Sequence, residues 1–472
     1  MGALPLRPFN VTSLPLILVT LAMTACGPGT RDRAPWDGVV PTLDLPILHQ
    51  ADPTAAAAGE SYFTTDLIGP ARLPLRGFRN LWLVWGGAAP SDDEGYWAAF
   101  ADRYGMVEAP FDNQGYPLGL RVNGDRALVD CMACHASELE GTVWLGAGSN
   151  RFDMQGLYGD VRELAALGGQ APPFQVDDGT GAAGANDAWG LGMQLAQLYY
   201  PPPEGVTVNS TYGYQRAGAW WTLKYKESMY SDGSAPSDGH RTMMAMLLAY
   251  GVTFDEMASL EPAFEDVREY LWSLPTPAWP ETFPAIDGEA AARGEEIFNT
   301  TCAECHGVHS GAEAEFPGRV IELGQIGTDP LRAERFRNQE VEYLTDFLNV
   351  ATGAQMTLTA TQGYLAPPLA GIWARAPYLH NGSVPTLAGL LESSTRPDVW
   401  QRVENADGHT RYDTSTVGLT YDTPAPTATW TDIEDRRIYD TARPGLDNSG
   451  HTFGDHLSET DRDDLLEYLK VL

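Results

Sequence analysis

Two short cysteine motifs constrain this chain more than any other feature. Each has two cysteines separated by two residues and followed at once by a histidine, and their members are Cys131, Cys134 and His135, then Cys302, Cys305 and His306. This C-x-x-C-H spacing is typical of haem c attachment, in which the thiols bind the porphyrin and the imidazole binds the iron. A single copy can arise by chance or as a redox dithiol beside a histidine. Two copies in one chain predict two covalently bound c-type haems.

The other cysteine usage agrees with this interpretation. The chain has 5 cysteines, and four of them belong to the two motifs. No pair remains for a structural disulfide, and the fifth cysteine is Cys26, near the start of the chain.

The first 26 residues have the pattern of an export signal. Arg7 precedes the apolar run of residues 14–23, and small residues lead to Cys26. Such a run is too short for a mature membrane span and indicates a secretory signal. The sequence Met23-Thr24-Ala25-Cys26 resembles a lipoprotein box, so we expect lipidation at Cys26; an ordinary signal peptide cut nearby is the alternative. The protein is expected in the periplasm, at the outer-membrane surface or outside the cell. Its only expected contact with the membrane is through a lipid attached to Cys26.

The charge of the chain excludes one class of partner. Its 30 basic and 63 acidic residues give a formal net charge of −33. An acidic surface repels phosphate backbones, so nucleic-acid binding is rejected. The charge is suited to steering a basic redox partner, although solubility alone also accounts for it. The expected partners are a small redox protein or a small-molecule electron donor.

Composition and apolar periodicity predict a mainly α protein with two cytochrome c-like haem domains and long irregular loops. Residues 27–60, rich in Pro, Asp and Ala, are expected to form a flexible tether. Residues 61–285 form the predicted N-terminal haem domain and residues 286–472 the C-terminal cytochrome c domain. A proline-rich stretch at 274–284 marks the boundary. Apart from the haem motif, no internal repeat is predicted.

The C-terminal domain shows the clearest helical pattern. An opening helix is predicted from Asp287 into the second motif, with Gly294 on its apolar face. Because glycine has no side chain, another helix can cross closely there. The predicted partner is the last helix, which starts at a capping-box-like pair, Ser458 and Asp461. Further helices are predicted at 241–250 and 264–273, and Trp82 and Trp85 are expected on one face of a buried helix.

The second axial ligand of each iron determines what the haem can do, because a vacant face can bind dioxygen or peroxide. No histidine lies between His135 and His240, and Met154 is the nearest soft candidate downstream. We therefore expect the first haem to have no permanent distal protein ligand. For the second haem the residues alone leave five candidates open, namely Met356, His380, His409, His451 and His456.

The segment 363–387 makes the chain resemble a known group of proteins. Its sequence is G-Y-L-A-P-P-L-A-G-I-W-A-R-A-P-Y-L-H-N-G-S-V-P-T-L, and it resembles the signature of the bacterial di-haem cytochrome c peroxidase superfamily. Gly450-His451 and Phe453-Gly454 near the end are more similar to the di-haem rubber oxygenase branch. The likeness extends over about residues 115–472 and is strongest after residue 290. The chain is shorter than expected for a polymer-cleaving oxygenase, which leaves the substrate open.

The resemblance implies a role for several residues. His135 and His306 would be proximal ligands, and His451 the distal ligand of the second haem. In the oxygenase branch the first haem keeps an open face for dioxygen. In some peroxidases of the superfamily a histidine soon after the first motif caps that haem, and this chain has none there. Calcium is kept as a further candidate cofactor.

Three residues of the signature segment are candidate catalytic residues. By the same resemblance, Arg375, Tyr378 and His380 would line the region between the haems. There a guanidinium can pair with a propionate, and a phenol and an imidazole can form hydrogen bonds. The alternative is that residues 377–387 form a rigid turn that packs the domains together.

These observations favour an exported di-haem oxidoreductase. The first haem would bind an oxygen species and the second would transfer electrons, with oxygenation of an apolar, polyisoprene-like substrate as the candidate reaction. Peroxide reduction is the alternative enzymatic hypothesis. A pure electron carrier, or a lipoprotein that only binds haem, represents the other classes of function.

Overall fold

The computed structural model describes residues 36, 38–87, 90, 92–169, 181–208, 213–353, 355–427 and 432–472. Residues 38–472 form one compact unit. The predicted signal peptide and Cys26 lie outside the described residues. Within them, no helix is both long and apolar enough to cross a membrane.

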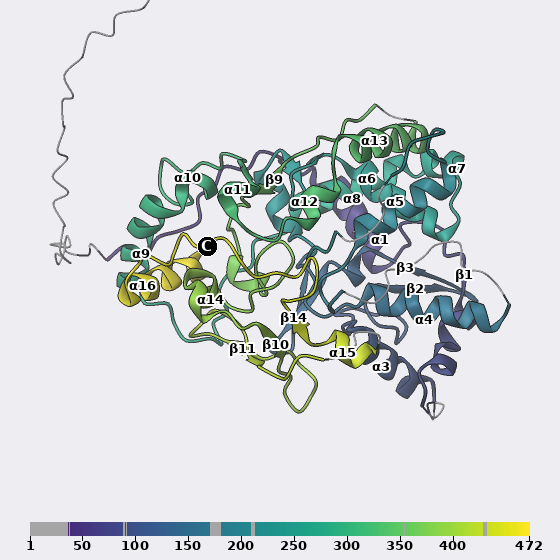
Figure 1. The fold of residues 1–472 in the computed structure, drawn as a ribbon, viewed down its shortest axis with the longest axis horizontal. Coiled ribbons are helices and arrows are strands. Elements are labelled where there is room, and N and C mark those ends of the chain that lie inside the picture. Colours follow the sequence, from purple (N-terminus) through teal and green to yellow (C-terminus); the bar gives the residue numbers. More distant parts are fainter. Residues whose placement is uncertain are drawn as a thin grey trace, which may run out of the picture. The chain divides into compact units, whose positions relative to one another are not determined.

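Helices dominate the structure, in agreement with the predicted mainly α class (Figure 1). The α-helices are α1 Pro53–Thr64, α2 Leu75–Arg79, α3 Asp93–Tyr104, α4 Met154–Leu167, α5 Ala188–Tyr199, α6 His240–Met244, α7 Phe254–Ser259, α8 Glu261–Ser273, α9 Gly288–Thr301, α10 Ala303–His306, α11 Leu323–Ile326, α12 Leu331–Arg335, α13 Asn338–Thr352, α14 Leu387–Leu391, α15 Ile433–Arg436 and α16 Glu459–Val471. Short 3₁₀ helices are η1 Leu81–Val84, η2 Cys131–Ala133, η3 Trp220–Tyr225, η4 Ala245–Tyr250, η5 Ile372–Arg375 and η6 Ser393–Thr395.

The strands are short and pair only in small antiparallel sheets. They are β1 Leu73–Pro74, β2 Leu120–Asn123, β3 Arg126–Val129, β4 Ala136–Leu139, β5 Thr142–Leu145, β6 Ser228–Met229, β7 Ala235–Pro236, β8 Val320–Glu322, β9 Gly363–Leu365, β10 Val399–Arg402, β11 Tyr412–Asp413, β12 Gly418–Leu419, β13 Tyr421–Asp422 and β14 Tyr439–Asp440. Their sheet orders are β1-β3-β2, β13-β10-β14, β4-β5, β6-β7, β8-β9 and β11-β12. In β2-β3, Leu120 is paired with Val129, and in β4-β5, Ala136 is paired with Leu145.

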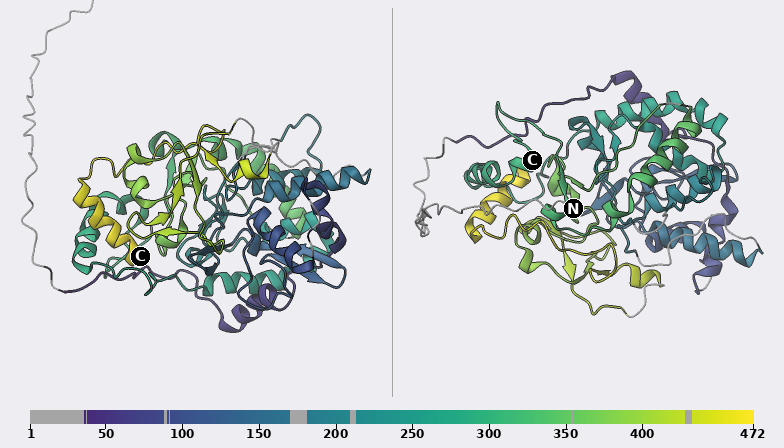
Figure 2. Two further views of the ribbon diagram at one scale, coloured as in Figure 1. Left: turned by 90° about the horizontal axis from the view of Figure 1, so that it is seen from below. Right: turned by 45° about the horizontal axis from the view of Figure 1, so that its top comes forward.

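The predicted contact between the opening and closing helices of the C-terminal region is confirmed. Helices α9 and α16 lie side by side in every view (Figures 1 and 2). A Cβ atom on Gly294 would lie 2.1 Å from the Asp464 carbonyl oxygen, so only glycine allows this approach. Asp287 caps the start of α9, and Ser458 accepts a hydrogen bond from the Asp461 backbone amide at the start of α16.

The structure shows a second helix pair of the same kind, which the sequence analysis missed. In α1, a Cβ atom on Gly59 would lie 2.1 Å from the Asp266 carbonyl oxygen of α8. Residues 55–63 and 290–298 share the pattern A-A-A-x-G-E-x-x-F, and residues 266–274 and 464–472 share D-x-x-E-Y-L-x-x-L. The capping aspartates also correspond, since the amides of Asp52 and Asp287 each donate to a glutamate of the closing helix at 2.9 Å.

This repeat changes the interpretation of residues 27–60. In its described part, the expected flexible tether contains the start of α1, with Ala56 and Gly59 buried against α8. Helices α1 and α8 flank the first cysteine motif along the chain, as α9 and α16 flank the second. The hydrophobic core includes residues from both sides of position 285, so the domain boundary stays a prediction.

One local expectation differs from the structure. The region of Trp82 and Trp85 is the short 3₁₀ helix η1, and both tryptophans are only partly buried against the core.

The segments on both sides of the first motif form the hairpins β2-β3 and β4-β5. Their tight turns contain Gly124 (φ +61°) and Gly141 (φ +81°), which adopt the left-handed backbone conformation that these turns require.

Substitution of Gly294 by alanine is expected to lower the free energy of unfolding by about 1–3 kcal/mol, because the added methyl group overpacks the α9–α16 crossing. Thermal or chemical unfolding of the haem-loaded protein measures the change. Gly324→Ala is the matched control, since a Cβ atom there meets nothing within 4 Å. Equal stability of the two variants would contradict the close crossing.

Candidate haem centre

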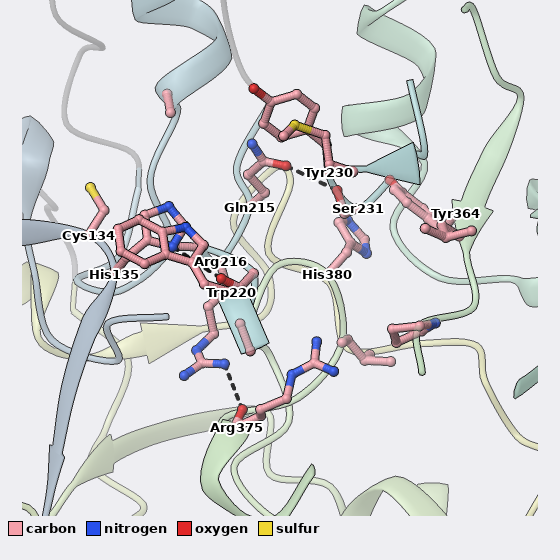
Figure 3. Close-up of a pocket in the computed structure, with 18 of the residues that line it drawn as sticks. Cys134, His135, Gln215, Arg216, Trp220, Tyr230, Ser231, Tyr364, Arg375 and His380 are labelled. Atoms are coloured by element: carbon pink, nitrogen blue, oxygen red, sulfur yellow. Dashed lines mark hydrogen bonds between the residues drawn. The ribbon is translucent and has the colours of Figure 1, made fainter. Parts of the chain in front are cut away.

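One cavity of about 550 Å³ connects the two cysteine motifs. Its lining includes all of the predicted site residues except Cys26, namely Cys131, Cys134, His135, Cys302, Cys305, His306, Arg375, Tyr378, His380 and His451. Figure 3 shows part of this wall, with His135 and His380 on different segments around a common space. The fold therefore brings together two motifs that lie far apart in the sequence.

The histidine of each motif is oriented by a backbone carbonyl group. His135 Nδ1 lies 3.1 Å from the Gly218 oxygen, and His306 Nδ1 lies 2.9 Å from the Pro367 oxygen. Because a carbonyl oxygen only accepts, each Nδ1 carries the proton and each Nε2 is left as a metal ligand. Burial lowers the pKa of His135 to about 4 and also lowers the pKa of His306, so both rings are neutral.

The cysteines have the character of thiols and not of a redox dithiol. The four motif cysteines are free, and burial raises the pKa of Cys131, Cys134 and Cys302 to about 12. Reactive dithiols and metal-binding thiolates instead have lowered pKa values. These environments favour the haem interpretation over a redox pair that precedes a histidine.

His451 lies opposite His306. Their ring centroids are 6.2 Å apart. An imidazole nitrogen binds a metal at about 2 Å, and the ring centre lies about 1 Å further away. Two imidazoles on opposite sides of one iron therefore need a separation of about 6 Å, which this pair has. Burial lowers the pKa of His451 to about 4, so this imidazole is neutral as well.

The backbone around His451 is held in an uncommon conformation. His451 has φ +46°, and a Cβ atom on Gly450 would lie 2.2 Å from the Gly327 carbonyl carbon. The Arg396 guanidinium donates to the carbonyl oxygens of Asn448, Gly450 and His451 at 2.6, 2.7 and 3.1 Å. Strained backbone persists where its surroundings over-determine it, as Arg396 does here.

Three other candidate axial ligands of the second haem, and His240, lie away from the cavity wall. Met356 is absent from the cavity wall, and its backbone exchanges hydrogen bonds with Asn349. His409 Nδ1 is 3.5 Å from a Glu138 oxygen, and His456 is exposed. His240 is bonded to Glu261 at 3.0 Å and does not line the cavity.

The wall of the cavity is mainly apolar and aromatic. Trp220 stacks on the His135 ring with centroids 4.4 Å apart (Figure 3). Met154, Met229 and Phe264 also line this cavity. Among the described cavity residues, the imidazoles besides the two motif histidines are those of His380 and His451. His451 faces His306, and the His380 ring stacks on Tyr364 at 3.9 Å.

Three cations converge on the cavity. Burial and the neighbouring Arg375 lower the pKa of Arg216 to about 9 and the pKa of Lys226 to about 7. Burial also lowers the pKa of Arg375, to about 10. Arg216 donates to the Arg375 carbonyl oxygen at 2.6 Å (Figure 3). It also donates to the Gly148 carbonyl oxygen at 2.6 Å. No carboxylate of the described chain forms an ion pair with any of the three. Buried cations without anions are costly, so this cluster fits an anionic ligand.

The three candidate catalytic residues have different surroundings. Arg375 belongs to the cation cluster. The Tyr378 hydroxyl donates to the Val417 carbonyl oxygen at 3.1 Å, so its polar end is used in packing. Burial lowers the pKa of His380 to about 3, and its buried Nε2 has no hydrogen-bond partner. His380 therefore has a neutral imidazole nitrogen available to a ligand, beside the cationic Arg375.

Sequence reasoning missed Arg216, Lys226 as a site residue, and Arg396 as the support of the His451 loop. Lysine is rare in this chain, so a buried lysine was a detectable signal. Arg216 and Arg396 belong to no local motif that predicts these roles.

Comparison with known proteins shows which class of protein this chain resembles. Residues 363–401 match the family described as RoxA-like, cytochrome c-like. A cytochrome c-like segment implies covalently bound haem c with its iron, and it indicates a haem oxidoreductase. The matched residues contain Arg375, Tyr378, His380 and Arg396.

Individual proteins are similar to this chain over about half of its length. The chain is 33% identical over 249 residues to "Uncharacterized protein y4iM" from Sinorhizobium fredii (strain NBRC 101917 / NGR234), which covers 43% of this chain and 53% of that protein. It is 27% identical over 279 residues to "Uncharacterized protein y4iJ" of the same strain, with 46% and 44% covered. The chain thus spans about half the length of the curated relatives it matches. A Kuenenia stuttgartiensis hydrazine synthase structure is similar over 56% of this chain and 74% of that chain, at 19% identity and a TM-score of 0.23.

Proposed function

We propose that this protein is an exported di-haem c-type oxidoreductase. In this proposal the haem held by His306 and His451 transfers electrons, and the haem at His135 binds an oxygen species. The observation that carries the proposal is the asymmetry of the two sites. His306 faces a second imidazole at 6.2 Å, whereas the ring that lies against His135 is that of Trp220, at 4.4 Å.

The helix repeat supports two haems over one. Each C-x-x-C-H motif lies between an opening helix with a critical glycine and a closing helix that crosses it. The Phe63–Tyr270 and Phe298–Tyr468 ring pairs, at 5.8 and 5.3 Å, occupy equivalent places in the two helix pairs. Because equivalent helix pairs flank both motifs, we expect both motifs to bind a haem.

The cation cluster fits the acidic groups of haem. Each haem c supplies a redox-active iron and two propionate carboxylates when it is bound. Arg216, Lys226 and Arg375 would pair with such carboxylates, and charge-assisted hydrogen bonds of this kind are the strong ones. His380, with a neutral imidazole, would offer a hydrogen bond to a small ligand inside the cavity.

The apolar wall favours an apolar, polyisoprene-like substrate, and dioxygenation is the candidate reaction. A peroxidase that reduces hydrogen peroxide is the second candidate, favoured by the superfamily signature at 363–387. Lipidation at Cys26, a location at the periplasm or outer membrane, and a small redox partner belong to the same proposal, and calcium remains a candidate cofactor.

Electron paramagnetic resonance of the oxidised protein tests the proposal. We expect one high-spin and one low-spin ferric signal with equal numbers of spins, and a spectral change at the high-spin haem alone when peroxide is added to the oxidised protein or dioxygen to the reduced protein. Product analysis with polyisoprene, and turnover with peroxide and a reductant, then separate the two enzymatic candidates. Two low-spin signals that do not change with either oxidant would leave only the electron carrier.

A further inference from the structure

A group of metal-ligand side chains lies outside the haem cavity, where α6 packs on α8. It consists of His240, Glu261 and Glu265, and one ligand atom from each lies within 4.8 Å of the others. Glu261 and Glu265 are four residues apart on α8, so their carboxylates lie on one face of this helix. The His240 side chain is only 2% exposed, whereas Glu265 is exposed. The group therefore extends from the protein interior to solvent.

The tautomer of His240 makes its contact with Glu261 unusual. The Nδ1 atom of this ring lies 2.9 Å from the Asp238 carbonyl oxygen, which only accepts, so Nδ1 carries a proton. The Nε2 atom lies 3.0 Å from Glu261 Oε1. In a neutral ring this nitrogen is an acceptor as well, and two acceptors repel each other at such a distance. The contact therefore requires either a second proton on the ring or a metal ion bound to Nε2.

The other carboxylate oxygen of Glu261 favours the metal ion. Arg241 already pairs with Oε1, and no donor of the described chain reaches Oε2, which is buried. A second proton on His240 would leave Oε2 without a partner, which costs free energy, whereas a metal ion bound to Oε2 satisfies it. Ligand atoms about 2 Å from a tetrahedral ion lie about 3.3 Å apart, and rotation of the exposed Glu265 side chain can supply the remaining movement.

We propose that His240, Glu261 and Glu265 bind one divalent transition-metal ion of the zinc class, with water completing its coordination. An imidazole together with carboxylates suits Zn²⁺, whereas Ca²⁺ prefers oxygen ligands alone. The hydrogen bond from Nδ1 to a backbone carbonyl group is the support that metal-binding histidines commonly have. This site goes beyond the proposed haem function and does not depend on it.

The ion would join two segments of the haem cavity wall. Thr242 and Met243 follow His240 in α6, and Phe264 precedes Glu265 in α8. Thr242, Met243 and Phe264 all line the cavity. A metal ion held by both helices would therefore fix these parts of the wall relative to each other, without contact with the haem.

Zinc binding by the purified haem-loaded protein tests the site. After treatment with a chelator and desalting, the protein is titrated with Zn²⁺ in a calorimeter, and its zinc content is measured by mass spectrometry after a second desalting. We expect one zinc ion per chain in the unsubstituted protein. Glu265→Gln is expected to weaken the affinity at least about tenfold, because loss of even a supporting residue lowers metal affinity about 10–100-fold. Glu163→Gln, at an exposed glutamate of α4, is the matched control and should bind zinc normally.

Thermal unfolding gives a second readout that is independent of haem chemistry. Zn²⁺ should raise the unfolding midpoint of the unsubstituted protein and of Glu163→Gln but not that of Glu265→Gln, because an ion that binds only the folded chain stabilises it. Since Glu265 is exposed, Glu265→Gln is expected to fold, so the test does not require a variant of the buried His240. Equal zinc affinity of the two glutamate variants, or no zinc retained by the unsubstituted protein, would overturn the site and leave a buried histidine–glutamate ion pair.

Discussion

A variant with serine at both Cys131 and Cys134 is expected to keep one covalent haem, to lose the other, and to lose all turnover with dioxygen or peroxide. Thioether bonds hold haem c to the chain, so serine at both positions removes the attachment at the first site only. The high-spin signal should disappear, and the low-spin signal should remain. Haem content by alkaline pyridine spectra, together with turnover assays, measures both effects.

The matched control carries serine at Cys302 and Cys305. This variant should also lose one haem but should keep the high-spin signal and its spectral response to peroxide. It should fail in steady-state turnover that depends on an external electron donor. If the first variant retained turnover and the second lost the response to peroxide, the assignment of the two sites would be reversed.

Replacement of His451 by alanine is expected to convert the low-spin haem into a high-spin haem. The substitution removes the imidazole that faces His306 and leaves the opposite side of the iron open to water or added ligand. Added imidazole should restore the low-spin spectrum, because the cavity then holds the missing ring. His456→Ala, which changes an exposed histidine five residues away, should leave the spectrum unchanged.

Gly450→Ala offers an independent test of the same geometry without removal of a ligand. The added methyl group would lie 2.2 Å from the Gly327 carbonyl carbon, so the loop must move and His451 with it. We expect a mixture of low-spin and high-spin species in this variant. An unchanged spectrum in both His451→Ala and Gly450→Ala would show that another residue binds this iron.

The local features of the candidate site were predictable from the sequence. The two C-x-x-C-H motifs and the caps at Asp287 and Ser458 each depend on residues within one or two helical turns. The crossing at Gly294 was expected from a single glycine on the apolar face of a helix. The segment 363–387 was recognisable for the same reason, because its specific residues are contiguous.

The α1–α8 helix pair was also predictable from the sequence, but the sequence analysis did not identify it. The alanine run before Gly59 follows prolines and aspartates, which is a composition typical of linkers. Comparison of residues 55–63 with 290–298 would have identified the repeat, since six of the nine positions are identical.

The sequence by itself determined which residues can bind haem and where helices begin, because attachment spacing and helix capping are local chemistry. The tertiary structure alone decided that His451 lies opposite His306 and that Arg216, Lys226 and Arg375 share one cavity. These relations join segments far apart in the chain, and they arise from packing of the whole core around the cavity. No local pattern specifies such distances, so only the folded chain can give the two motifs different surroundings.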